Sequence, residues 1–250
     1  MQLIDSHCHI HDKKFFGENR EAVYSRARNM DIGMLLVGTS EQDSAEAVRF
    51  AMTHEATWAV VGVHPHDSQS GWSHVKNLLD NTNDRIVGIG EIGLDYFYDN
   101  SPRDVQIEAF EAQLQLAKDY VLPVSFHVRE AFDDFWPILA NFPNVKGVLH
   151  SYTDDEKNLE IALGKGMLIG INGISTFATD KQTLFDSVPL ENILLETDSP
   201  FLTPVPHRGT INEPAFVRNV AEYHAKRRQM PLDHLSRVTS ANARALFALY

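Results

Sequence analysis

Short apolar runs alternate with longer amphipathic stretches along the chain. The runs are rich in Val, Ile and Leu, and there are eight of them, at residues 3–9, 34–39, 59–64, 86–94, 123–128, 147–150, 167–171 and 193–197. Near-continuous apolar runs of this length are typical of strands that are buried on both faces, as they are in parallel sheets. The pattern therefore predicts a parallel sheet of eight strands.

Helical spacing in the intervening stretches predicts the layer that covers this sheet. The clearest amphipathic stretches are residues 21–30, 43–53, 105–120, 131–141 and 155–163. The seventh connection, 175–188, has only a short and weakly patterned helix, and two more helices, 214–229 and 232–249, follow the last strand. Eight strand–helix units in 250 residues predict an α/β fold, a slightly distorted (β/α)8 TIM barrel with two C-terminal helices.

A doubly wound open sheet is the competing fold. It is disfavoured because no Gly-rich phosphate fingerprint follows an early strand. The polar residues also gather at the carboxyl ends of many strands, which is where barrel enzymes carry their active sites. No linker or break in composition divides the chain, so we expect residues 1–250 to form a single domain.

Histidines and carboxylates close the predicted strands. Along a strand successive side chains alternate between faces, so His7 and His9 share one side of the first strand and Cys8 takes the other. Further residues of the metal-ligand type end later strands: His64, Glu91, His127, His150, Glu196 and Asp198. Each of them alone has an ordinary structural explanation, such as a helix cap for Asp198. Their recurrence at the same end of six strands is an improbable coincidence and predicts a metal site.

The number of these side chains predicts more than one ion. Four of these five imidazoles, with two or three of the carboxylates, already exceed the needs of one tetrahedral ion. They suit two divalent ions about 3.5–4 Å apart, bridged by a carboxylate and a water. Mixed nitrogen and oxygen ligands favour zinc, manganese, iron, cobalt or nickel over a pure magnesium or calcium site.

Other charged residues near the predicted mouth have two interpretations. Arg129 and Arg208 could hold an anionic group of the substrate, or they could pair with acidic neighbours. The role of His66, two residues after His64, is left open between a structural and a functional one. The histidines in loops or on helix faces are expected to be solvated: His11, His54, His74, His224 and His234.

Charge and composition limit the class of protein. With 34 acidic and 22 basic residues, the formal net charge is −12, which disfavours a DNA-binding module. Bound divalent ions would nevertheless make the field of a cleft positive, so a nucleic-acid substrate is compatible with this charge. A single cysteine, no signal peptide and no apolar run long enough to span a bilayer favour the cytoplasm.

The strand-end motifs resemble those of the TatD-related metal-dependent hydrolases, TIM-barrel members of the amidohydrolase superfamily that include DNases. The resemblance is carried by Asp5-Ser6-His7-Cys8-His9, Gly62-Val63-His64-Pro65-His66, Gly90-Glu91-Ile92-Gly93-Leu94-Asp95-Tyr96, His127-Val128-Arg129-Glu130-Ala131-Phe132 and Leu195-Glu196-Thr197-Asp198-Ser199-Pro200. It implies metal ligands at His7, His9, Glu91, His127, His150 and Asp198. It also implies that Glu91 bridges the ions and that His64 lies near the scissile phosphate.

We therefore expect a phosphodiester hydrolase, specifically a 3'-5' exonuclease acting on DNA, with RNA left open. Two divalent ions (zinc, manganese, magnesium, nickel or cobalt) would activate a water, and Asp198 is the candidate general base. His64, with Arg129 and Arg208, would neutralise charge on the phosphoryl oxygens. Glu196 is expected to hold a water or an additional ion. We also expect the protein to be a monomer.

Two alternatives remain at this point. The same metals could hydrolyse an ester or amide, as in D-aminoacyl-tRNA deacylation. From a different class, the chain could be a non-catalytic binding protein that keeps its metals for structural reasons.

Overall fold

The computed structural model describes residues 3–81, 84–98 and 100–249. Its contacts divide the chain into two compact units, which we describe separately. Unit 1 takes in the described residues of Met1–Leu36 and His150–Tyr250, and unit 2 those of Val37–Leu149. That residues 1–250 form a single domain stays a prediction.

Eight strands follow the order predicted from the apolar runs. They are β1 (Leu3–Cys8), β2 (Ile32–Val37), β3 (Thr57–Val61), β4 (Ile86–Asp95), β5 (Val124–Arg129), β6 (Gly147–Leu149), β7 (Leu168–Ile171) and β8 (Ile193–Leu195). Neighbouring strands within each unit pair in parallel, and the strand order of the sheet is that of the sequence. Register shifts interrupt the β1–β2, β3–β4 and β4–β5 ladders, which agrees with the distortion predicted for the sheet.

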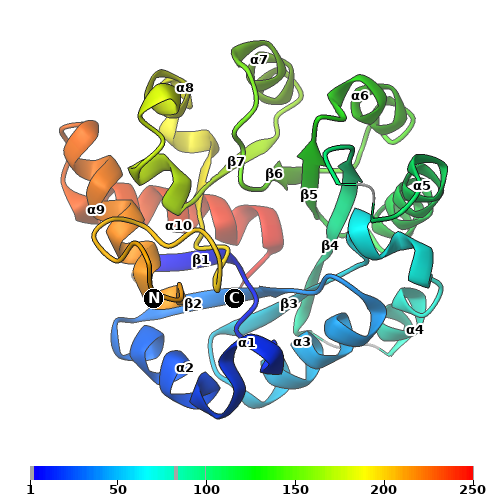
Figure 1. Cartoon of the computed structure of the whole chain (residues 1–250), viewed down its shortest axis with the longest axis horizontal. Helices are drawn as coiled ribbons and strands as arrows, with labels where there is room; N and C mark the ends of the chain where they lie inside the picture. Colours follow the sequence, from blue (N-terminus) through cyan, green and yellow to red (C-terminus); the bar gives the residue numbers. More distant parts are fainter. Residues whose placement is uncertain (1–2, 82–83, 99, 250) are drawn as a thin grey trace. The chain divides into compact units, whose positions relative to one another are not determined.

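Helices connect successive strands in both units (Figure 1). Those of unit 1 are α1 (Lys13–Phe16), α2 (Arg20–Asn29), α7 (Glu156–Gly164), α8 (Gln182–Ser187), α9 (Val217–Arg227) and α10 (Leu232–Phe247). Those of unit 2 are α3 (Glu41–Thr53), α4 (Val75–Asp80), α5 (Arg103–Asp119) and α6 (Phe132–Ala140). The short helix predicted for the seventh connection is α8, and the two predicted terminal helices are α9 and α10. The short helices α1 and α4 were not predicted.

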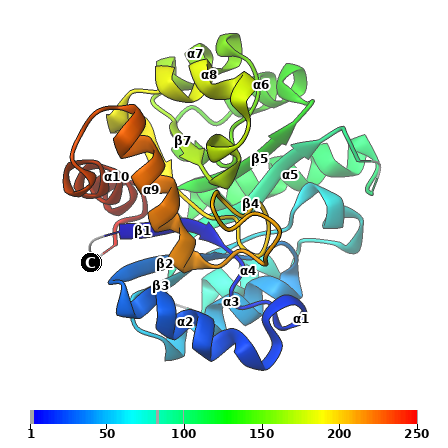
Figure 2. The ribbon, with the colours of Figure 1, turned by 60° about the vertical axis from the view of Figure 1, so that its left-hand side comes forward.

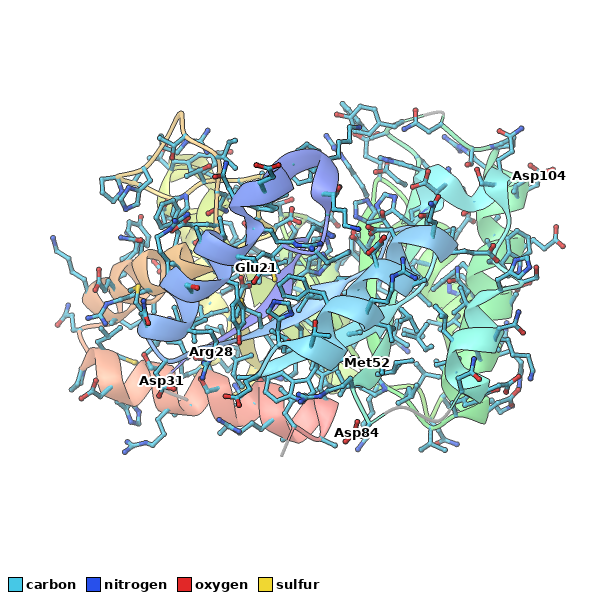
Figure 3. The ribbon with its side chains drawn as sticks, turned by 90° about the horizontal axis from the view of Figure 1, so that it is seen from below. Glu21, Arg28, Asp31, Met52, Asp84 and Asp104 are labelled. Atoms are coloured by element: carbon cyan, nitrogen blue, oxygen red, sulfur yellow. The ribbon has the colours of Figure 1, made fainter. Side chains whose placement is uncertain are left out.

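In unit 2, aromatic packing fixes helix α5 and helix α6 on the sheet. Phe110 of α5 and Phe126 of β5 are fully buried, and so is Phe135 of α6. Their ring centroids lie 5.3–6.1 Å apart, within the range of favourable aromatic pairs. On the outer surface of the same unit, Met52 of α3 is 61% exposed (Figure 3).

In unit 1, a buried carboxylate joins β1 to the chain that leaves β8. Asp5 accepts hydrogen bonds from the amide of Thr197 (2.8 Å) and from its hydroxyl (2.6 Å). The amide of Asp198 donates to the carbonyl of His7, and the amide of His9 donates to the carbonyl of Ser199, both at 2.8 Å. Helices α9 and α10 both contact β1 (Figure 2).

A glycine allows β4 and β5 to approach closely beside His127. Gly93 has φ = +147°, and a Cβ atom at this position would overlap the carbonyl oxygen of His127. Only glycine combines this backbone conformation with the space available, so Gly93 determines how near His127 comes to β4.

Within the described residues, no helix is long and apolar enough to cross a membrane.

Gln113 of α5 supports the chain segment that carries His64. Its side chain accepts a hydrogen bond from the amide of Val63 (2.7 Å) and donates one to the carbonyl of Val63 (3.1 Å). Both backbone groups are buried, so Gln113→Ala should leave two polar groups without partners. We expect the free energy of unfolding to fall by about 2 kcal/mol or more, measured by urea denaturation.

Gln115 of the same helix provides the matched control. It is exposed and bonds only to Asp119, so Gln115→Ala should change the free energy of unfolding by less than about 0.5 kcal/mol. Equal stability of the two variants would contradict the role assigned to Gln113.

Candidate metal centre

Unit 1 brings His7 and His9 together with Asp198. His9 directly follows β1, and the two imidazole rings meet edge to face with centroids 5.1 Å apart, so the two side chains lie together as predicted. Asp198 Oδ1 lies 3.4 Å from His9 Nε2 and 3.9 Å from His7 Nε2. These three residues can present one ligand atom each to a common point. Asp198 has φ = +56°, a left-handed conformation that is uncommon for residues other than glycine.

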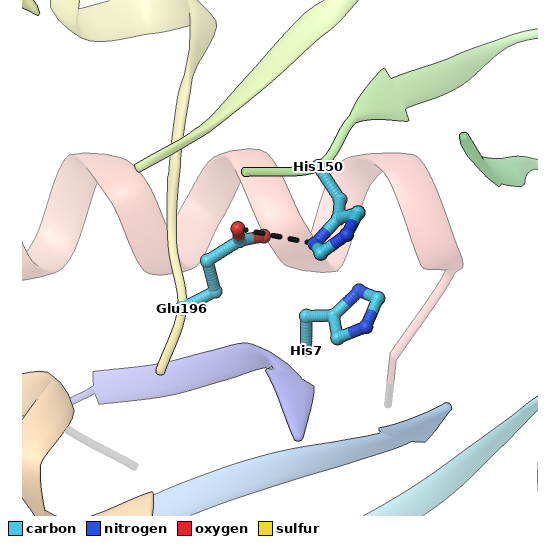
Figure 4. Close-up of side chains that lie close together, drawn as sticks. All are labelled: His7, His150 and Glu196. Carbon is cyan, nitrogen blue, oxygen red and sulfur yellow. Dashed lines mark ion pairs between the residues drawn. The ribbon is translucent and has the colours of Figure 1, made fainter. Parts of the chain in front are cut away.

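His7 also belongs to a second group, with His150 and Glu196 (Figure 4). The His150 ring stacks on the His7 ring at a centroid distance of 3.9 Å. Glu196 Oε1 lies 3.4 Å from His150 Nδ1. We call the five residues His7, His9, His150, Glu196 and Asp198 cluster 1.

Glu196 is held by one of its two oxygens. Oε1 accepts hydrogen bonds from the amide of Ser151 (2.7 Å) and from Asn172 Nδ2 (3.3 Å). Oε2 is buried and has no hydrogen-bond partner among the described residues. Gly170 leaves the room that this carboxylate occupies, because a Cβ atom there would overlap it. A buried carboxylate oxygen without a donor suits a cation.

Unit 2 carries a separate group around His127, which we call cluster 2 (His64, His66, Glu91, Asp95 and His127). His127 Nδ1 lies 2.9 Å from Glu91 Oε1, and His127 Nε2 lies 2.9 Å from Asp95 Oδ2. If Nε2 carries the proton and donates to Asp95, the lone pair of Nδ1 faces the side of Glu91. A carboxylate that orients a histidine in this way is common behind histidine ligands of metal ions.

His64 differs from His127 in which ring nitrogen is available. Its Nδ1 accepts a hydrogen bond from the amide of His66 (3.1 Å), and an amide can only donate. The neutral ring therefore carries its proton on Nε2, which lies 3.4 Å from Glu91 Oε1. His64 Nε2 is thus a hydrogen-bond donor in this state, which suits contact with an anion better than ligation of a metal.

The electrostatics favour charged carboxylates and neutral imidazoles. Burial opposes ionisation of Asp198, but the hydrogen bond from His9 and the nearby His150 and His7 hold the pKa of its carboxyl below the usual value. Burial likewise opposes ionisation of Asp95, but hydrogen bonds from His127 and His66 outweigh it and lower its pKa. Burial and the neighbouring His127 lower the pKa of His64 to about 4.

The donor set fits divalent cations. Both clusters combine imidazole nitrogens with buried carboxylate oxygens, the ligands that zinc, manganese, cobalt and nickel accept. Several buried carboxylates without a bound cation would be costly, because charges removed from water need partners.

Of the remaining predicted residues, Arg129 is the last residue of β5 and Arg208 lies well after the end of β8. The guanidinium of Arg129 lies 3.8 Å from the ring centroid of Phe97. Arg208, in the segment after β8, donates to the carbonyl of Thr203 (2.8 Å) and lies 3.8 Å from the ring centroid of Phe177. The substrate-binding roles assigned to these arginines stay predictions.

Sequence reasoning gave no role to Asp95 and left His66 open. His66 Nε2 lies 3.0 Å from Asp95 Oδ2, so this carboxylate serves two histidines. A signal for Asp95 existed, since it follows Glu91 by four residues on one strand and residues at even spacing share a face.

The expectation that His11 and His224 are solvated is wrong. Both are buried. His224 Nε2 lies 2.8 Å from the hydroxyl of Ser175, which itself donates to the carbonyl of Asn172 at 2.6 Å. Because the hydroxyl proton is already used, Ser175 accepts a hydrogen bond from His224 Nε2. Burial and the nearby Arg228 lower the pKa of His224 to about 4.

Comparison with known proteins identifies the family. The family model described as TatD related DNase matches residues 4–248. The "3'-5' ssDNA/RNA exonuclease TatD" of Erwinia amylovora is 38% identical over 94% of this chain and 95% of its own. The "Uncharacterized metal-dependent hydrolase YabD" of Bacillus subtilis is 31% identical over 99% of each chain.

A solved structure agrees with these relatives. The crystal structure of the TatD homologue YJJV from Escherichia coli superposes with a TM-score of 0.92 at 27% identity, covering 100% of this chain and 99% of that one. The predicted (β/α)8 barrel fold is thereby confirmed. The chain belongs to the TatD related DNase family, and its predicted class, a metal-dependent hydrolase, is confirmed.

Asp95→Asn tests the orientation of His127. An amide nitrogen facing Nε2 would favour a proton on Nδ1, which would remove the lone pair on the Glu91 side. We expect affinity for one divalent ion to fall about 10–100-fold, measured by equilibrium dialysis and elemental analysis. The exposed Asp84→Asn variant (Figure 3) should bind as the parent does, and unchanged binding in Asp95→Asn would contradict the assignment.

The buried His224 predicts a dependence of stability on pH. Its folded pKa of about 4 lies below the unfolded value of 6.5, so the unfolded chain binds the proton first as the pH falls. The free energy of unfolding should therefore decrease from about pH 6.5 to pH 4, by up to roughly 1 kcal/mol per pH unit, and level off below.

Urea denaturation at several pH values in a chelator measures this slope. His224→Gln should reduce the slope, and the matched variant of the exposed His234, His234→Gln, should keep it. A slope in His224→Gln equal to that of the parent would show that His224 does not carry the effect.

Proposed function

We propose that this hydrolase cleaves phosphodiester bonds of single-stranded DNA or RNA and releases nucleotides from the 3' end. The observation that carries the proposal is the presence of two groups of nitrogen and oxygen donors at strand carboxyl ends, His7–His9–Asp198 in unit 1 and His64–Glu91–His127 in unit 2. One such group would serve a one-ion hydrolase, whereas phosphodiester hydrolysis is commonly supported by two ions. The relatives named as exonucleases support the same activity.

We assign one divalent ion to each cluster, with zinc, manganese, magnesium, nickel or cobalt as candidates. Bound there, the ions would act as Lewis acids and lower the pKa of a water toward neutrality. In cluster 1 the ligands would be His7, His9 and Asp198, and in cluster 2 Glu91 and His127. Ligation by His150 and bridging by Glu91 remain part of the proposal drawn from the family resemblance.

The protein's own groups have distinct tasks in this reaction. Asp198 is ionised at neutral pH, so its carboxylate can accept the proton of the attacking water. His64 carries its proton on Nε2 and can donate it in a hydrogen bond to a phosphoryl oxygen. Asp95 takes no part in bond breaking; as the partner of His127 Nε2 it would turn Nδ1 of that ring toward Glu91.

The acidic character of the protein makes substrate binding depend on the ions. The formal net charge is −12, and Glu91, Glu196 and Asp198 would repel a phosphate in a protein without cations. Divalent ions invert the local charge, so a chelator should remove binding as well as turnover.

Asp198→Asn tests the proposed base. It keeps the size of the side chain and removes the charge, so we expect hydrolysis to fall at least about 100-fold while the fold is retained. Release of nucleotides from 5'-labelled single-stranded DNA and RNA, with each divalent ion in turn and with a chelator, measures the effect. Asp104→Asn, on the exposed face of α5 (Figure 3), is the control and should hydrolyse at the parent rate.

Two results would contradict the proposal. Full turnover in Asp198→Asn would exclude this residue as the base. A parent protein that releases no nucleotide with any ion, but hydrolyses carboxylic ester or amide substrates in parallel assays, would assign the site to acyl transfer.

A further inference from the structure

Two adjacent aromatic rings stand exposed immediately after strand β4. Phe97 is 49% exposed and Tyr98 is 44% exposed, although rings of this size are usually buried. They belong to unit 2 and follow the strand that carries Glu91 and Asp95. Hydrophobic packing within the described residues thus leaves much of both rings uncovered, which points to a ligand or another function for them.

Hydrogen bonds fix the loop that presents these rings. Asp95 Oδ1 accepts from the amides of Phe97 (3.0 Å) and Tyr98 (3.1 Å). Gln106 Nε2 donates to the carbonyls of Asp95 (3.0 Å) and Ser101 (2.9 Å), so one side chain bonds to the backbone on both sides of the two rings. The rings are therefore held in place before any ligand arrives, and little conformational entropy is lost on binding.

A planar cation lies against the same two rings. The Arg129 guanidinium is 3.8 Å from the ring centroid of Phe97 and 5.0 Å from that of Tyr98. The two rings are nearly perpendicular, at 86°, with centroids 4.7 Å apart. Among the residues that the structure describes, Arg129 forms no ion pair with a carboxylate, and its side chain is exposed. Aromatic rings combined with arginine are the means by which proteins stack unpaired bases.

The rings are connected to cluster 2 through one side chain. The Tyr98 ring meets the His66 ring edge to face at 5.3 Å, and His66 bonds to Asp95. Asp95 thus fixes the loop through Oδ1 and orients His127 through Oδ2. A phosphate at cluster 2 and a base on the rings would belong to the same nucleotide or to adjacent nucleotides.

We propose that Phe97, Tyr98 and Arg129 form a stacking subsite for an unpaired nucleobase of the substrate strand. The inference rests on the proposed function and adds to it the part of the substrate that is recognised besides the phosphate. Stacking requires an exposed base face, which a base within a duplex does not offer, so the subsite selects single strands. It tolerates any base, because every base has a π-face.

Fluorescence of 2-aminopurine tests the subsite without relying on turnover. Single-stranded oligonucleotides carry the probe at the 3' or the 5' end and bind to the Asp198→Asn variant with manganese present. We expect the fluorescence of one of the two probes to be quenched on binding. Tyr98→Leu and the double variant Phe97→Leu/Tyr98→Leu, made in the same background, should lose the quenching and bind about 10-fold more weakly.

Two controls make the result specific. An oligonucleotide whose terminal residue is abasic should bind equally well to the variants with and without the rings. Met52→Ala removes an exposed apolar side chain on α3 and should leave quenching and affinity unchanged. Thermal unfolding of each variant identifies any variant that has lost its fold. If the leucine variants are misfolded, the conservative Tyr98→Phe variant replaces them and should retain the quenching, because it keeps the ring.

The outcomes separate this inference from the proposed function. Quenching and affinity that survive in both leucine variants would overturn the stacking subsite, whether or not the parent cleaves DNA. If the parent cleaves no phosphodiester but the probe is quenched and the leucine variants lose the quenching, the subsite stands and the proposed reaction fails. With the parent enzyme, the supporting result is a KM raised about 10-fold in Tyr98→Leu at unchanged kcat.

Discussion

Buried imidazoles and carboxylates at the ends of parallel strands must find partners within the protein or in a bound cation, and this constraint explains most of what surrounds the candidate metal centre. An ion removed from water without a partner costs several kcal/mol. The protein meets the constraint with shared carboxylates: Asp5 bonds to Thr197, and Asp95 bonds to two histidines. Glu196 Oε2, a buried carboxylate oxygen without a hydrogen-bond partner among the described residues, suits a cation.

The shared carboxylate of Asp95 also links two parts of the site. Because Asp95 uses one oxygen for the loop amides and the other for His127, the position of the exposed rings and the tautomer of a metal ligand depend on one side chain. The amide of His66 occupies Nδ1 of His64 and so leaves the Nε2–H of that ring as the donor. Two histidines of cluster 2 thus have different tasks: His127 is a proposed metal ligand and His64 a hydrogen-bond donor. The difference comes from their hydrogen-bond partners, because the two side chains are chemically the same.

The alternation of apolar runs was enough to predict the eight strands in order, because parallel strands buried on both faces need continuous apolar sequence. The ends of the strands were predicted less accurately. Strand β3 ends at Val61, so His64 lies in the following turn and not on the strand. Most of the proposed ligands could be named because they recur at one end of the strands, and the structure brings His7, His9 and Asp198 together. Which ring nitrogen each histidine offers depends on its hydrogen-bond partner, the Asp95 carboxylate for His127 and the amide of His66 for His64, and no sequence pattern shows these contacts.

Two errors have a physical cause. His224 follows Val217, Val220 and Ala221 at helical spacing, which places it on the buried face of α9, so the pattern itself contained the signal that was missed. The exposed rings of Phe97 and Tyr98 had no such signal, because a loop has no periodicity and its conformation is determined by Asp95 and Gln106.

The central claim, that each cluster binds one divalent ion, is tested most directly by anomalous X-ray diffraction from crystals grown with manganese. The account predicts two anomalous peaks per chain, one about 2.0–2.3 Å from ligand atoms of His9 and Asp198 and the other at a similar distance from His127 Nδ1 and Glu91. A single peak, or peaks away from these residues, would contradict it.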